Sequence, residues 1–120
     1  MQPVLNGGIY VYTVLPDAFA AVDMAQVLAT FRETEGVTAI MPESAARSAG
    51  LPILFRCAWI TLAVDSALDA VGFTAAFSRA LGDAGISCNV VAAAHHDHVF
   101  VPFERGTQAL DCLRALQASA

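Results

Sequence analysis

Apolar and polar positions follow the most regular pattern in the C-terminal half of the chain. A continuous apolar run rich in β-branched residues predicts a buried strand, and the apolar stripe after it recurs every three to four positions, which predicts an amphipathic helix. Two further strands flank a polar turn, and a last leucine-rich stretch again has helical spacing. The predicted segments are residues 55–64 (strand), 73–84 (helix, ended by Gly85), 87–94 (strand packed on both faces), 99–103 (strand) and 106–117 (helix).

The N-terminal half is less regular but follows a related order. It begins with an alternating strand and ends with a short alanine-rich helix that Gly50 stops. Between them, the apolar residues of one stretch fit either a helix or a strand, and a hairpin turn follows. The predicted segments are residues 8–14 (strand), 18–31 (loop or short helix, then strand), 33–36 (turn), 37–41 (strand) and 42–49 (helix).

The two halves share the order strand, variable segment, strand, strand, helix, which predicts a fused repeat. We assign a partial N-terminal module to residues 1–53 and a second module to residues 54–120. The fold class is α+β and ferredoxin-like: two βαββαβ-type modules with antiparallel sheets, the first lacking a clear first helix. Each copy lacks a final strand, and an unpaired sheet edge is a liability. We therefore expect exchanged strands that make one compact unit, or pairing across a dimer.

Composition narrows the partners of such a fold. With 57% hydrophobic and 14% charged residues, the chain is rich in apolar surface, and a homodimer interface is the simplest place for it. The longest apolar run ends at Asp65, well short of the ~18 residues of a membrane span, and no basic leader precedes it, so we expect a cytoplasmic protein. Six scattered arginines and a net charge of −5 leave no basic face for nucleic acid.

Enzyme chemistry has few candidates in this sequence. The three histidines lie in one turn, no serine or cysteine stands in a nucleophile motif, and no glycine-rich loop opens a helix after a strand. Cys57, Cys88 and Cys112 are too far apart for a zinc knuckle or a redox pair. The sequence predicts a non-catalytic protein without a cofactor, with a small ferredoxin-like enzyme as the remote alternative.

Residues 28–51 and 65–113 carry a resemblance to a known family, most specifically in "GISCNV" and the "HHDHVFVPFE" that follows it. Over about residues 7–117 the chain resembles small bacterial proteins made of two fused ACT-like modules, which are similar to the regulatory ends of aspartokinases and to the tandem modules of arginine sensors. The resemblance implies a tandem ACT fold, edge-to-edge pairing of modules, and amino-acid binding at module interfaces.

The same resemblance points to the loop between the first strand and the first helix of the second module as the ligand site. A helix N-terminus favours a carboxylate, a glycine allows close approach to the backbone, and an aspartate at the strand end could take the ligand's ammonium group. The expected binding residues are Asp65, Ser66, Val71, Gly72, Phe73 and Thr74 in this loop, with Asn89 on the next strand, where a buried amide would need a partner. The alternative is that Ser66 and Asp69 merely cap a helix that starts at Ala67, with Gly72 inside it.

The turn at residues 95–98 (HHDH) is a second candidate. Imidazole and carboxylate groups are metal ligands, but alternate strand residues share a face, so only His96 and His98 would point together, and two histidines do not complete a site. The resemblance includes this turn, so His96, Asp97 and His98 are expected in a ligand site or an interface. A polar hairpin in which Asp97 bonds its own backbone is the structural alternative.

Three functions follow from these patterns. The first is a non-catalytic, allosteric regulatory domain that binds a small molecule, expected to be an amino acid, near a module or dimer interface. The second is a dimerisation or interaction module without a ligand. The third is a small metal-dependent protein that uses residues 95–98. No feature of the sequence identifies the amino acid.

Overall fold

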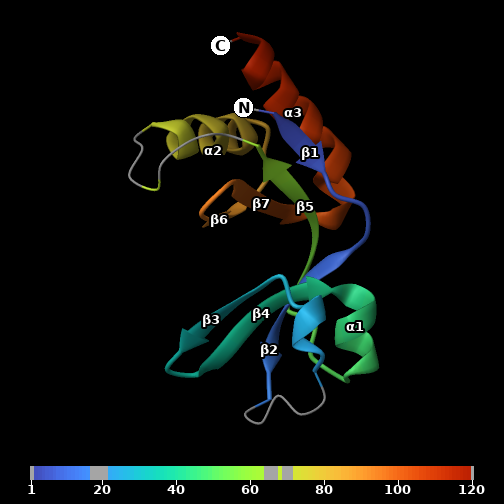
Figure 1. Ribbon diagram of the computed structural model, residues 1–120. Helices are drawn as coiled ribbons and strands as arrows, with labels where there is room; N and C mark the ends of the chain where they lie inside the picture. Colours follow the sequence, from blue (N-terminus) through green and yellow to red (C-terminus); the bar gives the residue numbers. More distant parts are fainter. Residues whose placement is uncertain (1, 17–21, 64–67, 69–71, 120) are drawn as a thin grey trace. The chain divides into compact units, whose positions relative to one another are not determined.

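A computed structural model describes residues 2–16, 22–63, 68 and 72–119 (Figure 1). The chain divides into two units, which we call the N-terminal unit (residues 8–57) and the C-terminal unit (residues 2–7 and 58–119). The repeat pattern of the sequence puts this division after residue 53 and leaves residues 2–7 with the first repeat. The division differs because strand pairing, and not chain order, decides which residues belong together.

The N-terminal unit is an antiparallel sheet with little helix. Its strands lie in the order β3-β4-β2-β5, and the first residues of β5 belong to this unit. Between β2 and β3, where the fold class has its first helix, the described residues contain one 3-10 turn, η1. The hairpin predicted at residues 33–36 is confirmed, since Glu33 pairs with Gly36 across the turn. Val11, Met41 and Ala46 form a buried cluster in this unit, and partly buried apolar residues pack against it. The elements are β2 (Tyr10–Leu15), η1 (Met24–Gln26), β3 (Ala29–Glu33), β4 (Gly36–Pro42), α1 (Glu43–Ser48) and β5 (Phe55–Leu62).

The C-terminal unit has the complete helical layer. Its strands lie in the order β1-β5-β7-β6, and inward residues of β5 and β7 alternate with outward ones, as a half-covered sheet requires. Two helices, α2 and α3, contribute Phe77, Leu81 and Leu113 to one buried cluster with these inward residues. The elements are β1 (Pro3–Leu5), α2 (Phe73–Asp83), β6 (Asn89–Ala92), β7 (Asp97–Pro102), η2 (Phe103–Arg105) and α3 (Gly106–Ser119), and Figure 1 labels all of them except η2.

In each unit, one strand comes from a part of the chain that the sequence analysis assigned to the other repeat. In the C-terminal unit β1 pairs antiparallel with β5, with Pro3 opposite Leu62 and Leu5 opposite Ile60. The start of β5 pairs with β2 in the N-terminal unit, where Tyr10 lies opposite Cys57. The strand that each sequence repeat lacks is therefore supplied by β1 in one unit and by β5 in the other.

Two details of the C-terminal unit differ from the sequence prediction. The strand expected over residues 87–94 is shorter and is not packed on both faces, because no residue of β6 is buried and Asn89 and Ala92 are exposed. The polar turn is also shorter than residues 95–98, since β7 already begins at Asp97, which pairs with Ala92. By contrast, the stop at Gly85 is confirmed: it has φ +74°, and the Ile86 N–H donates to the Leu81 carbonyl at 2.9 Å.

Candidate functional site

The N-terminus of α2 is the described part of the predicted binding loop. The helix begins at Phe73, and Gly72 is its N-cap with φ +95°, in the left-handed region that favours glycine. The first helical bond joins the Ala76 N–H to the Gly72 carbonyl at 3.1 Å. Gly72 is therefore not an interior glycine of α2, which the alternative would require. Ala67, where the alternative begins its helix, lies outside the described residues. Asp65, Ser66 and Val71 lie outside the described residues.

The first turn of α2 leaves backbone N–H groups directed beyond the helix end. No described side chain makes a capping hydrogen bond there, and no acidic residue occupies the first turn. Such an N-terminus carries a partial positive charge and suits an anion. The two predicted residues on the helix differ: Thr74 is exposed, whereas Phe73 packs edge-on against Phe77, with ring centroids 5.2 Å apart. Phe73 is thus mainly a core contact.

The remaining predicted residues lie on or beside β6 and β7. Because Asn89 is exposed on β6, its amide has access to water, and the argument that it needs a buried partner does not hold. His95 and His96 are exposed in the turn, which the Ala93 N–H closes by donating to the His96 carbonyl at 3.1 Å. Asp97 is 8% exposed at the start of β7. Among the described residues, no hydrogen bond joins any of these side chains to Thr74 or to one another.

His98, which the sequence analysis paired with His96, lies in a hydrogen-bond network on the outer face of the C-terminal sheet. The Trp59 Nε1–H donates to His98 Nδ1 at 3.0 Å, and Asn6 Nδ2 donates to Thr61 Oγ1 at 2.9 Å. Thr61 Oγ1 in turn lies 3.4 Å from His98 Nδ1. Because Nδ1 accepts from the indole, the neutral ring carries its proton on Nε2. Strand alternation could have placed His98 on this face.

Burial lowers the pKa of His98 below its ordinary value, and the nearby His96 adds to this effect, while Asp97 partly opposes it. The ring is therefore held in its neutral form. The indole engages Nδ1 of His98, whereas His96 is exposed in the turn. In the part of the chain that the structure describes, no three His, Cys, Asp or Glu side chains are grouped so as to hold a metal ion.

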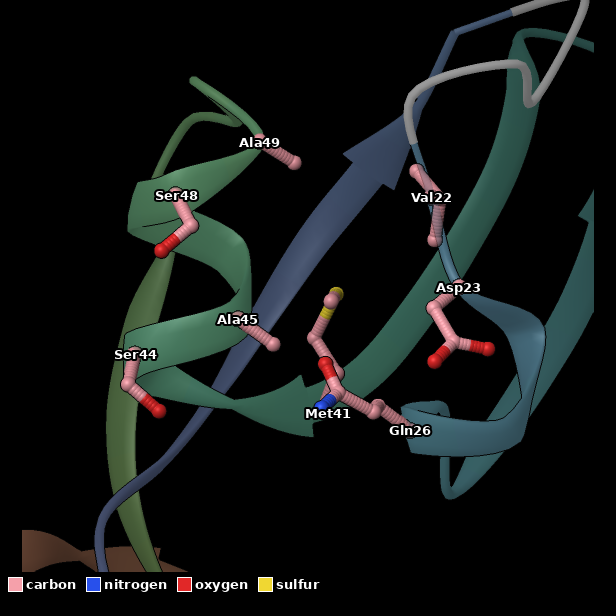
Figure 2. Close-up of a pocket in the computed structure, with 8 residues that line it drawn as sticks. All are labelled: Val22, Asp23, Gln26, Met41, Ser44, Ala45, Ser48 and Ala49. Atoms are coloured by element: carbon pink, nitrogen blue, oxygen red, sulfur yellow. The ribbon is translucent and has the colours of Figure 1, made fainter.

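A cavity of about 270 Å³ lies in the N-terminal unit (Figure 2). It lies between the Val22–Gln26 segment and one face of α1, with Met41 between them. Nothing in the sequence pattern indicated this cavity, because its lining residues are mostly small and come from three separate segments. Its lining residues are Val22, Asp23, Gln26, Met41, Ser44, Ala45, Ser48 and Ala49.

Comparison with known families agrees with this fold. Two family models, each described as an ACT domain, match residues 1–58 and 54–115. No curated protein matches the sequence. The chain belongs to the ACT domain family and contains two ACT domains in tandem, as the resemblance in the sequence implied. ACT domains are regulatory, ligand-binding modules, and this is the class to which the chain belongs.

Solved structures show the same architecture. A Vibrio cholerae protein of unknown function, described as a possible transport protein, is 43% identical, with a TM-score of 0.85 over 93% of this chain and 86% of its own. The ligand-free regulatory subunit of aspartate kinase from Thermus thermophilus is 12% identical, with a TM-score of 0.69 and 97% coverage of both chains. A protein from Agrobacterium tumefaciens is 16% identical, with a TM-score of 0.78 over 96% of this chain and 87% of its own. The two at low identity share the fold. None of the described helices is long and apolar enough to cross a membrane.

Proposed function

We propose that this chain is a non-catalytic regulatory protein that binds an amino acid at residues 65–74 and passes the effect on through a homodimer. The observation that carries the proposal is its tandem ACT architecture, because the two matching family models together account for nearly the whole chain. The likeness to aspartate kinase regulatory subunits supports a regulatory module of this kind.

The chemistry at the start of α2 supports the position of the site. The ligand carboxylate would accept hydrogen bonds from the first-turn N–H groups that Gly72 leaves accessible, and the hydroxyl of Thr74, an exposed residue of the same turn, would add a donor. Asp65 would take the ammonium group. A ligand bound in this way would need to favour one arrangement of the dimer by about 1–3 kcal/mol to act as an allosteric effector.

Calorimetric titration with the twenty amino acids tests the proposal. One of them is expected to bind, Asp65→Asn to weaken that binding, and Thr74→Val to weaken it less. Glu104→Gln is the matched control, since it makes the same change of charge at an exposed residue of η2 and should leave binding unchanged. Absence of heat with all twenty amino acids, or equal loss in the control variant, would count against amino-acid binding at this loop.

A ligand-free interaction module is the second candidate, and one feature favours it. Phe31 is 72% exposed on β3, the last strand of the sheet order in the N-terminal unit. An exposed aromatic side chain on a sheet edge is a common pairing surface. If this function is correct, light scattering will give a dimer whose stability does not change with any amino acid, and Phe31→Lys will give a monomer.

A further inference from the structure

The cavity of the N-terminal unit lies where the described residues contain no long helix beside α1. In the C-terminal unit α2 and α3 both contribute large side chains, among them Phe77, Leu81 and Leu113, to the buried cluster. In the N-terminal unit the corresponding first helix is reduced to the single turn η1 in the described residues. The α1 helix therefore has no long helical neighbour, among the described residues, to fill the space beside it, although protein interiors normally leave little space unfilled.

The face of α1 that lines this space carries only small side chains. They occur at positions i, i+1, i+4 and i+5, which place them in two successive turns on one side of the helix. Two are apolar and two carry hydroxyl groups. Figure 2 shows the methyl groups of Ala45 and Ala49 directed towards the segment that contains Asp23 and Gln26. The four residues are Ser44, Ala45, Ser48 and Ala49.

The floor and the rim of the cavity differ in chemistry. The floor is apolar, since Met41 is 1% exposed and belongs to the buried cluster of this unit. Among the described residues of the lining, Asp23 is the one that carries a charge. Its Oδ1 accepts the Ala25 N–H at 3.0 Å, which orients the carboxylate and leaves the other oxygen for a ligand. A carboxylate with a second oxygen available favours a donor with positive charge.

No cation among the described lining residues neutralises this carboxylate. The arginine nearest to the lining in sequence, Arg47, belongs to α1 but not to the cavity lining, and its Nη2 lies 3.5 Å from Glu43 Oε2. Arg56 donates from Nε to the same Glu43 oxygen at 2.7 Å. Both of these guanidinium groups are therefore engaged with Glu43, and the cavity keeps a net negative charge from Asp23.

We propose that this cavity binds a small organic ammonium compound with a short aliphatic chain. The ammonium group donates to Asp23, with Gln26 and Ser48 as neutral partners, and the aliphatic chain lies over Met41. The cavity is smaller than the roughly 300–1,000 Å³ of sites for drug-sized ligands, so a compound of a few heavy atoms fits it. This site shares no residue with the proposed amino-acid site and lies in the other unit, so it is a second site of the protein.

NMR titration of the full chain with n-butylammonium tests the proposal, and butyrate is the matched probe of similar size and opposite charge. We expect saturable shifts of the backbone amides of residues 22–26 and 44–49 with n-butylammonium and none with butyrate. Asp23→Asn keeps an acceptor for the Ala25 N–H but removes the charge, so it should weaken binding about fivefold, as expected for an accessible ion pair.

Two leucine variants of α1 separate occupancy of the cavity from general damage to the helix. Ser48→Leu places a larger side chain in the cavity lining and should abolish the shifts, whereas Arg47→Leu, on the same helix but outside the lining, should leave them unchanged. Equal shifts with butyrate, unchanged affinity in Asp23→Asn, or persistent binding in Ser48→Leu would each overturn the proposal. Amino-acid binding at residues 65–74 is measured in a different titration and at a different site, so either proposal can fail without the other.

Discussion

Replacing Gly72 by alanine tests the backbone geometry on which the proposed amino-acid site depends. Gly72 has φ +95°, and a Cβ atom added there meets no atom of the described residues within 4 Å. The cost of the substitution is therefore conformational and not steric. Holding a non-glycine residue in the left-handed region costs about 1–2 kcal/mol, which exceeds the gain from a stiffer unfolded chain. Subtracting that gain, we expect Gly72→Ala to be less stable than the wild type by about 0.5–1 kcal/mol.

Gly82 provides the matched control in the same helix. A Cβ atom added at Gly82 likewise meets no atom within 4 Å, but the φ of this residue is not positive. Gly82→Ala should therefore stabilise the protein by about 0.5–1 kcal/mol, as alanine does in a helix. Urea unfolding measures both variants, and the fluorescence of Trp59, which is the one tryptophan of the chain and belongs to the same unit, reports the transition. If Gly72→Ala were as stable as Gly82→Ala, the left-handed N-cap would be refuted.

Three further predictions concern the C-terminal unit and the strand that both units share. The lowered pKa of His98 means that the folded state favours the neutral ring. Its contribution to the free energy of unfolding is complete above the unfolded-state pKa near 6.5 and is lost as pH falls through the lowered pKa of the folded state. Urea unfolding between about pH 8 and 5 should show this loss, and His98→Gln should remove it, whereas His95→Gln should not. A Cβ at Gly106 would lie 2.9 Å from the Ala58 Cβ, so Gly106→Ala should lower the free energy of unfolding by about 1–3 kcal/mol. The double variant with Ala58→Gly should recover part of that stability, and strictly additive effects of the two substitutions would contradict the contact. Burial raises the pKa of the Cys57 thiol to about 12, so iodoacetamide should label Cys88 and Cys112 in the native protein and leave Cys57 unmodified until urea is added. Mass spectrometry identifies the labelled residues, and labelling of Cys57 in the native protein would contradict its burial.

Local rules were enough to predict much of this fold from the sequence. The apolar stripe of α2 and the stop at Gly85 depend on contacts within a few residues, and the hairpin at residues 33–36 depends on a tight turn between two β-rich strands. The order of elements in each half indicated the ferredoxin-like class, and comparison with known families confirms tandem ACT domains. These features were predictable because periodicity and backbone sterics act along the chain.

Features that depend on residues distant in sequence required the tertiary structure. Pairing of β1 with β5 assigns residues 2–7 to the C-terminal unit, and the edge position of β6 exposes Asn89, although its neighbours in sequence are apolar. The bond from Trp59 to His98 joins residues 39 positions apart. The cavity beside α1 likewise needs three segments to come together.

In the predicted ligand loop, the sequence and the tertiary structure each determined a different property. Its residue types suggested a carboxylate site from sequence alone, and amino-acid binding there stays a prediction. The structure decided that α2 begins at Phe73 and that Gly72 is a left-handed N-cap, because helix boundaries depend on which backbone groups find partners. The chemistry of the side chains can therefore be predicted from the sequence, whereas the position of a helix end, a sheet edge or a cavity is decided by packing.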